Sequence, residues 1–357
     1  MLVRTVTIAS WTRTRGRQMP TYQYFPARYE GPIRTLLLDA NVTAHLDTIA
    51  RKGTEYADGV VNRRMADLVR RLDADARVLP GLGAGEGVMR RAGLQDVSNY
   101  RRRSENAQEL LAGDRSRITA WLEGEALPDP RVPGDAEHPS EIGTEEFEIV
   151  RENLLIPSYA VMLKAYQLYL QGRSPESGFR VLAGFAEELF ARGSREVLLG
   201  ALLLAGNHTG REMALNIMKL REQKDLASTL DALWNTSFDL THSRVATMPS
   251  LPEFRGAFEV PCVFVTDDRH LGRFLQILQP AGAMSMKRGG GITGDHAYLK
   301  RVLQDGMLAK VVEIVEAGND RALNETTDVE DMARIRRYRA RAYADQLEGW
   351  LAERLDG

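Results

Sequence analysis

The amino-acid sequence predicts an α/β fold, with a central parallel sheet flanked by helices, interrupted by an all-helical insertion and followed by a C-terminal helix. Two short apolar runs, at residues 33–38 and 260–265, each end at acidic residues and are typical of parallel strands buried on both faces. Between them lies a long stretch whose apolar residues recur at helical spacing. The sheet domain is therefore expected to be split by the helical stretch.

The composition is that of an ordinary globular protein, with 357 residues of which 43% are hydrophobic and 27% are charged. Single cores rarely grow past about 250 to 300 residues, so this length favours two units or one domain with a large insertion. Lysine and arginine (47) nearly balance aspartate and glutamate (49). Any binding of a polyanion must therefore depend on a local patch of charge.

The expected location is the cytoplasm, without membrane attachment. The single cysteine excludes an internal disulfide and a cysteine-based zinc site, which is typical of a reducing compartment. The longest apolar run is about half of the roughly 20 residues that a membrane helix needs. No basic-then-apolar leader opens the sequence.

Composition and periodicity divide the chain into five predicted segments. These are an arginine-rich N-terminal extension (1–32), the first part of the α/β domain (33–114), a mainly helical insertion (115–225), the second part of the α/β domain (226–300) and a C-terminal helical region (301–357). Closely spaced prolines between residues 114 and 148 mark a connector. The insertion and the residues just after it are predicted to be helical from about 145 to 232.

Within the first part, the spacing predicts alternating strands and helices. The strand at 33–38 is followed by a helix from about 44, a helix at 61–72, a short strand at 77–79 and a helix at 81–92. The apolar run at 260–265 supplies the last strand. A capping box from Thr327 to Glu330 opens one long C-terminal helix.

Carboxylates directly follow the two apolar strands, Asp39 after the first and Asp267 and Asp268 after the second. Reactive groups in an open parallel sheet collect beyond the carboxyl ends of the strands, so we expect these acids at one edge. Carboxylates held that close repel one another, and a divalent cation with oxygen ligands relieves the repulsion. The sequence therefore predicts a Mg²⁺ or Mn²⁺ site suited to phosphodiester hydrolysis.

Both strand ends resemble the corresponding motifs of PIN-domain nucleases. The opening Asp-x-Asn-Val motif is matched at residues 39–42, which include Asn41, and the closing Thr-x-Asp motif is matched at residues 266–268. This resemblance implies a PIN-like (Rossmannoid) fold and a metal-dependent endoribonuclease. It covers about residues 33–110 and 226–290, and the helical insertion separates its two halves far more widely than in compact family members.

The resemblance also implies a set of site residues. It adds Glu86, in a helix after the second strand, and Asp239, at the start of the helix before the last strand. The implied catalytic and metal-binding acids are Asp39, Glu86, Asp239 and Asp268, with Asp267 as a further metal ligand. Asn41 and Thr266 are the implied substrate-binding or supporting residues.

Basic residues provide the expected contacts to nucleic acid. Lys287 and Arg288 precede three glycines and could clamp a phosphate backbone, although a glycine-rich surface turn would have the same sequence pattern. Arginines of the C-terminal helix could hold RNA or pack against a partner. The expected substrate is RNA, with single-stranded DNA as the alternative. By resemblance, bacterial toxin or defence enzymes are the expected relatives, with an inhibitory partner protein or a homo-oligomer.

The sequence is also compatible with two other functions. A haloacid-dehalogenase-like phosphohydrolase also begins with a strand that ends in Asp, but Asn41 stands where that family has its general acid. A PIN-like binding scaffold without catalysis would leave Asp39 as a helix cap and Glu86 as a first-turn acid. The histidines at 45, 208 and 242 lack partners at metal-ligand spacing, which favours structural roles for them.

Overall fold

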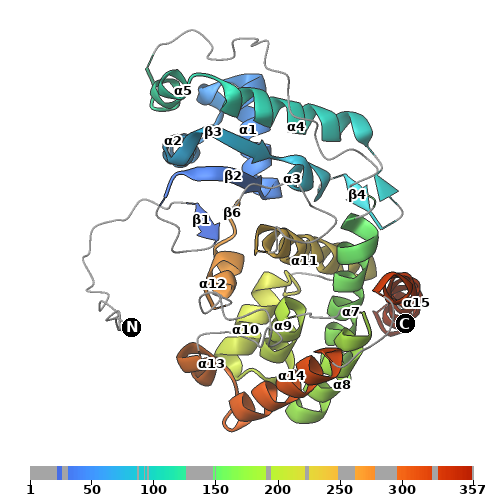
Figure 1. Cartoon of the computed structure of the whole chain (residues 1–357). Helices are drawn as coiled ribbons and strands as arrows, with labels where there is room; N and C mark the ends of the chain where they lie inside the picture. The colour runs from blue at the N-terminus through green and yellow to red at the C-terminus, as the bar shows by residue number, and fades with distance from the viewer. Residues whose placement is uncertain are drawn as a thin grey trace.

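The computed structural model describes residues 22–25, 31–86, 88–91, 93–94, 96–125, 148, 150–189, 194–221, 225–247, 262–277, 296–323 and 329–355. Helix predominates in these ranges, around one open four-stranded sheet and one small hairpin (Figure 1). The predicted phosphate clamp, Lys287 and Arg288, lies outside the described residues, as does most of the arginine-rich N-terminal extension.

The sheet is mixed, whereas the sequence predicts a parallel sheet. Its strands are β1 (Gln23–Phe25), β2 (Ile33–Leu38), β3 (Leu72–Leu79) and β6 (Cys262–Thr266), in the order β1-β6-β2-β3. β2 runs parallel to β3 and to β6, as predicted, whereas β1 pairs antiparallel with β6. β1 has only three residues, so its sequence is too short for an alternating pattern to reveal it.

Three of the helices that follow β2 are predicted by the sequence, with shifted ends: α1 (Ala40–Lys52), α2 (Gly59–Arg71) and α3 (Gly81–Glu86). The sequence analysis does not predict η1 (Thr54–Tyr56), α4 (Val97–Ala112) or α5 (Arg115–Leu122), and α5 lies in the stretch predicted as a connector. The helix predicted for 81–92 ends at Glu86, and the chain turns into the hairpin of β4 (Met89–Arg90) and β5 (Gly93–Leu94). Gly93 has a φ of 124°, a backbone conformation that no helix contains.

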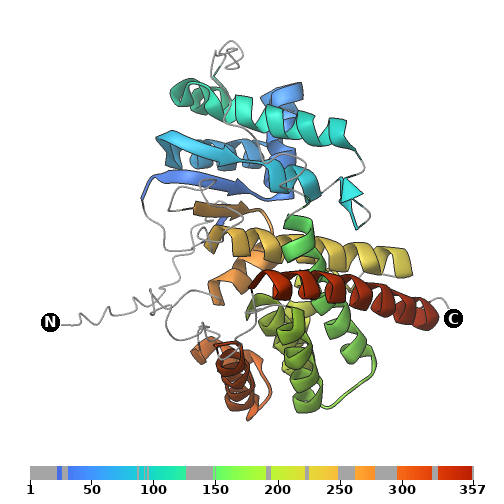
Figure 2. The same ribbon diagram turned by 45° about the vertical axis from the view of Figure 1, so that its right-hand side comes forward.

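The helices from residue 151 onward, which we call the helical half, follow the predicted helical pattern. It comprises η2 (Arg151–Leu155), α7 (Ile156–Leu170), α8 (Pro175–Leu189), α9 (Ser194–Ala205), α10 (His208–Ile217), α11 (Leu226–Thr247), α12 (Arg269–Ile277), α13 (His296–Val302), α14 (Met307–Leu323) and α15 (Val329–Leu355). The long C-terminal helix α15 lies beside α7 and α11 (Figure 2). Among the helices that the structure describes, none is both long enough and apolar enough to cross a membrane.

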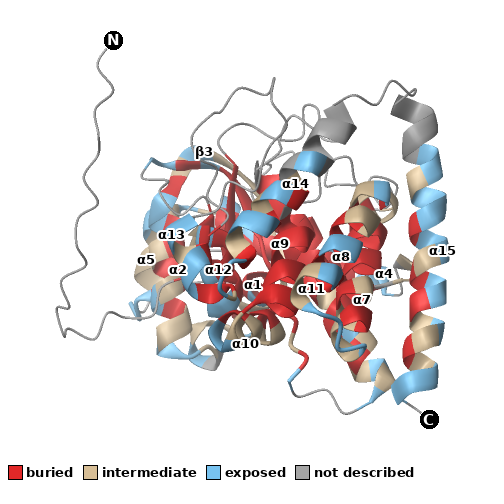
Figure 3. Ribbon diagram, turned by 90° about the horizontal axis from the view of Figure 1, so that it is seen from below, coloured by how far each residue is buried: buried red, intermediate tan, exposed pale blue. Residues whose placement is uncertain are grey.

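Each face of the sheet belongs to a different apolar core. Leu36 and Leu38 of β2 pack with Val263 and Val265 of β6 into a core shared with α1, α2, α4 and α5. The alternate residues, among them Leu37 and Phe264, join a larger core formed mainly by the helical half. The helical half therefore covers one face of the sheet directly, and its helices α7 and α9 consist largely of buried residues (Figure 3).

Candidate metal centre

Asp39 and Thr266 connect the ends of the two central strands. The parallel register places Leu38 opposite Val265, so the next residues of both strands emerge side by side. The Asp39 carboxylate accepts hydrogen bonds from the Asn41 backbone N–H, at 2.7 Å, and from the Thr266 hydroxyl. Asp39 is buried and also begins α1 as its N-cap. Burial raises the pKa of Asp39, although these hydrogen bonds oppose the shift.

Asp267 and Asp268 have different partners. Asp267 forms an ion pair with Arg64 of α2, so it does not need a metal ion to neutralise it. The Asp268 carboxylate accepts hydrogen bonds from the backbone N–H groups of His270 and Leu271, at 2.7 and 3.0 Å, and thus caps α12. Both residues are partly exposed, which places them on the solvent side of the strand ends.

Glu86 is brought to this edge by the close packing of α3 against the end of β2. A Cβ atom on Gly83 would lie 2.5 Å from the Leu38 carbonyl oxygen and 2.6 Å from Thr43 Oγ1, so only glycine allows this approach. Glu86, the last residue of α3, is buried, and its Oε2 atom has no hydrogen-bond partner in the described part of the chain. Burial first, and then Asp239 and Asp39, raise the pKa of Glu86 well above its usual value.

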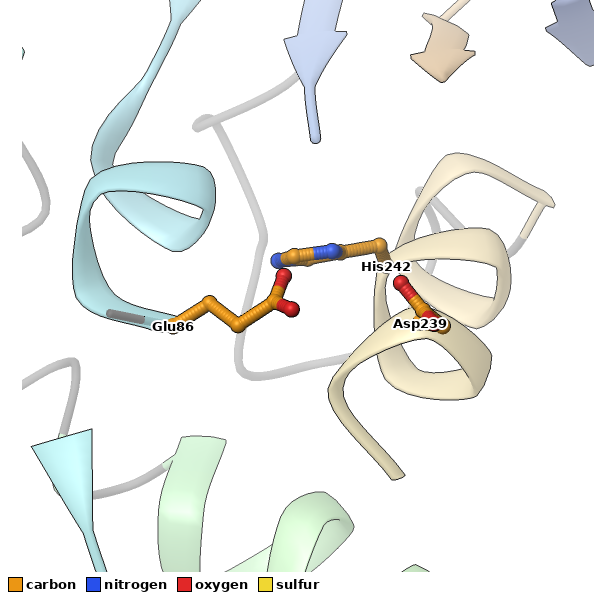
Figure 4. A group of neighbouring side chains, drawn as sticks. All are labelled: Glu86, Asp239 and His242. Atoms are coloured by element: carbon orange, nitrogen blue, oxygen red, sulfur yellow. The ribbon is translucent and has the colours of Figure 1, made fainter. Parts of the chain in front are cut away.

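Asp239 and His242 lie one turn apart on α11 and face Glu86 (Figure 4). Asp239 lies in the middle of α11 rather than at the predicted helix start, because the helix already begins at Leu226. Glu86, Asp239 and His242, the buried trio, each offer a ligand atom within 4.8 Å of the others. Neither His242 ring nitrogen makes a hydrogen bond of regular geometry with a described residue.

The charges of the four predicted acids act on one another. Burial raises the pKa of Asp239 to about 7, with further increases caused by Asp39 and Asp268 and an opposing effect of Lys219. Asp39 and Asp268 also raise the pKa of Glu86. Asp39 and Asp268 therefore lie near enough to Glu86 and Asp239 to influence their titration, and we call these four residues the acidic site.

Lys219 is a cation that the sequence analysis does not identify. It follows α10, with Nζ 3.8 Å from Asp239 Oδ2 and a side chain that is 40% exposed. Its backbone has a φ of 54°, which is uncommon for a residue with a side chain. The acids around it raise its pKa, Asp239 most strongly. Lys219 belongs to the predicted insertion, and nothing in its local sequence indicates that it reaches the sheet.

The remaining predicted residues differ in their relation to the site. Thr266 contacts Asp39 directly, whereas Asn41 lies exposed in the first turn of α1 and contacts the Asp39 carboxylate through its backbone N–H. His242, for which the sequence favours a structural role, instead faces the acids. Its signal is its spacing of three residues from Asp239, which becomes informative only once Asp239 is known to lie inside a helix.

The donor set of the acidic site fits a divalent cation. Glu86 Oε2 is buried without a hydrogen bond within the described residues, and Asp239 Oδ2 has only the long ion pair with Lys219, so both atoms in a native fold need an explanation. Burial lowers the pKa of His242 to about 4, against the opposing effect of a hydrogen bond with the Leu82 backbone, so its imidazole is neutral at physiological pH. A divalent cation would bind these oxygens and relieve the repulsion between the carboxylates.

Comparison with known proteins finds no matching family model, no matching curated protein and no matching solved structure.

Proposed function

We propose that this protein is a metal-dependent nuclease with a PIN-like catalytic domain, and that its substrate is RNA. The observation that supports this function is the acidic site, in which the buried carboxylates of Asp39, Glu86 and Asp239 and the partly exposed Asp268 come from separate segments of the chain. Repulsion among buried carboxylates lowers stability unless a cation is bound, so a fold that retains such a site is best explained by metal binding.

Asp39, Glu86 and Asp239 would hold Mg²⁺ or Mn²⁺, with Asp268 at the solvent side. The bound ion would make a water molecule more acidic and neutralise charge that develops on the phosphate. The Thr266 hydroxyl fixes the orientation of the Asp39 carboxylate. Because the Lys219 side chain is half-exposed beside Asp239, its ammonium group can contact a phosphate oxygen of the RNA.

The C-terminal helix offers a second contact surface for RNA. Residues 334–341 of α15 contain five arginines and no acid. Tyr338 is 76% exposed among them and presents an aromatic face on which a base can stack. Since the whole chain carries almost no net charge, such a local patch is what RNA binding requires.

The decisive experiment compares two matched aspartate substitutions. Asp39 and Asp58 both cap helices through their side chains, and Asn caps as well as Asp, so Asp39→Asn and Asp58→Asn preserve the caps. With Mn²⁺ and a pool of RNA, Asp39→Asn should reduce cleavage by roughly a hundredfold or more, as removal of one active-site electrostatic group does. Asp58→Asn should cleave like the wild type.

Cleavage by Asp39→Asn at the wild-type rate, with both variants folded, would contradict the proposed mechanism. Absence of RNA cleavage by the wild type, with Mn²⁺ bound, would favour the scaffold instead. A covalent adduct of Asp39 with beryllofluoride would favour the phosphohydrolase, because that chemistry passes through an aspartyl-phosphate and nuclease chemistry does not.

A further inference from the structure

We infer that His242 is a nitrogen ligand of this metal centre, and that the centre therefore selects Mn²⁺ or a later transition-metal ion over Mg²⁺. The inference rests on the metal site of the proposed function and adds to it the identity of a ligand and the class of ion. It departs from the all-oxygen ligand set that the sequence predicts.

The first step is the position of the imidazole. His242 is three residues after Asp239 on α11, so both side chains project from the same face of the helix. The ring points toward the Glu86 carboxylate on α3 (Figure 4). Its ligand atom and those of the two acids lie within 4.8 Å of one another, a spacing that one ion can bridge.

The second step is that the imidazole has few other partners. His242 is fully buried, and its polar contact within the described residues is a hydrogen bond of irregular geometry with the Leu82 backbone, which leaves the other ring nitrogen for a metal ion. Its aromatic neighbours, Phe238 and Phe264, have ring centroids 5.9 and 5.6 Å away. These rings restrict the orientation of the imidazole but satisfy neither nitrogen. A buried polar group without a partner is costly, and coordination to an ion removes that cost.

The third step is the chemistry of the donor set. Mg²⁺ prefers near-octahedral oxygen ligands and keeps several waters, whereas imidazole suits transition-metal ions. Two carboxylates and a neutral imidazole therefore favour Mn²⁺, Co²⁺ or Zn²⁺. The competing explanation is a metal-free pair in which a protonated Glu86 donates a hydrogen bond to His242, and the experiment separates the two.

The experiment measures nitrogen coordination directly on Mn²⁺-loaded full-length protein. Pulsed electron paramagnetic resonance should detect modulation by an imidazole ¹⁴N nucleus, and labelling all six histidines with ¹⁵N should change its frequency. This labelling test needs no substitution. His242→Gln should abolish the modulation, while His208→Gln, at an exposed position on α10, should retain it.

Titrations with Mn²⁺ alone and Mg²⁺ alone provide the second readout. His242→Gln should weaken Mn²⁺ binding by about tenfold or more, the scale of lost metal-site contacts, and Mg²⁺ binding by much less. Mn²⁺ binding without nitrogen modulation in the wild type would overturn the inference and leave the proposed nuclease intact. Nitrogen modulation in a protein that cleaves no RNA would support the ligand and contradict the proposed function.

Discussion

At the scale of single residues, Lys219 partly neutralises the acidic site when no metal ion is bound. Its ammonium group is the cation beside Asp239, and it opposes the rise that burial causes in the pKa values of Asp39, Glu86 and Asp239. A lysine and a divalent ion would compete for the same carboxylates. Under the proposed function, we therefore expect Lys219 both to stabilise the metal-free protein and to limit its affinity for metal.

Removal of this charge should have opposite effects with and without metal. Lys219→Asn removes the ammonium group while keeping a residue that tolerates positive φ. Because the side chain is partly exposed, we expect a loss of about 1 kcal/mol in the metal-free unfolding free energy. Thermal melts with increasing Mn²⁺ should reveal a larger metal-induced stabilisation than in the wild type, whereas Lys219→Arg should behave like the wild type. Equal Mn²⁺ shifts in all three proteins would contradict the competition.

The site residues differ in how far the sequence could identify them. The adjacency of Asp39 and Thr266 could be predicted because each ends an apolar strand, and the ends of paired parallel strands meet. Lys219 and His242 could not be found in this way. One follows a helix of the predicted insertion and the other lies inside a helix, so only tertiary packing relates them to the sheet.

At the scale of elements, the short helix α3 controls the distance between Glu86 and the end of β2. Its close approach depends on Gly83, since a Cβ atom there would lie 2.8 Å from the Asp39 carbonyl carbon. Real Cβ contacts are never that short against backbone, so any larger residue must displace α3. Gly83 therefore serves the packing of α3 against β2.

Substitution of Gly83 should damage the site through this displacement. Gly83→Ala should weaken Mn²⁺ binding and lower the melting temperature, even though alanine favours helix. The matched control is Gly184→Ala on α8, where a Cβ meets nothing within 4 Å. That variant should gain roughly 0.5 to 1 kcal/mol from helix propensity and bind Mn²⁺ normally. Unchanged Mn²⁺ affinity in Gly83→Ala would refute this role of α3.

The elements themselves were predictable where their sequences carry a clear period. β2 and β6 are mostly apolar because their faces are buried, apart from the exposed Arg34 of β2, and α15 follows from its capping box and long helical pattern. β4 was predicted as part of a helix, and β5 was not predicted, because two-residue strands have no detectable period. The same limit hid β1.

At the scale of the whole molecule, a buried ion pair joins helices of the helical half to α11, the helix that carries Asp239 and His242. Glu196 of α9 pairs with Arg244 of α11 and accepts a hydrogen bond from Ser158 of α7 at 2.9 Å. Burial alone would raise the pKa of Glu196, but Arg244 and the hydrogen bonds outweigh it, so the pKa is lowered. The position of α11 therefore depends on this ion pair.

This network should make the stability depend on pH in a defined direction. A lowered pKa in the folded state adds stability above the ordinary value of 4.5 and loses it as the pH falls below that value. Glu196→Gln should reduce the unfolding free energy by about 3 to 5 kcal/mol at neutral pH, because Arg244 loses its charged partner. In urea titrations, the difference in unfolding free energy between Glu196→Gln and the wild type should be smaller at about pH 4 than at neutral pH. An exposed control, Glu105→Gln on α4, should change neither value.

The order of the strands has a consequence for how the protein is synthesised. β6 lies between β1 and β2 in the sheet, yet its Thr266 is 227 residues from its hydrogen-bond partner Asp39. At about 5 to 20 residues per second, the ribosome needs roughly ten to fifty seconds to translate the chain between them. Throughout that interval the nascent polypeptide lacks its central strand. Under the proposed function, the enzyme would thus remain inert beside the translation machinery until its synthesis is nearly complete.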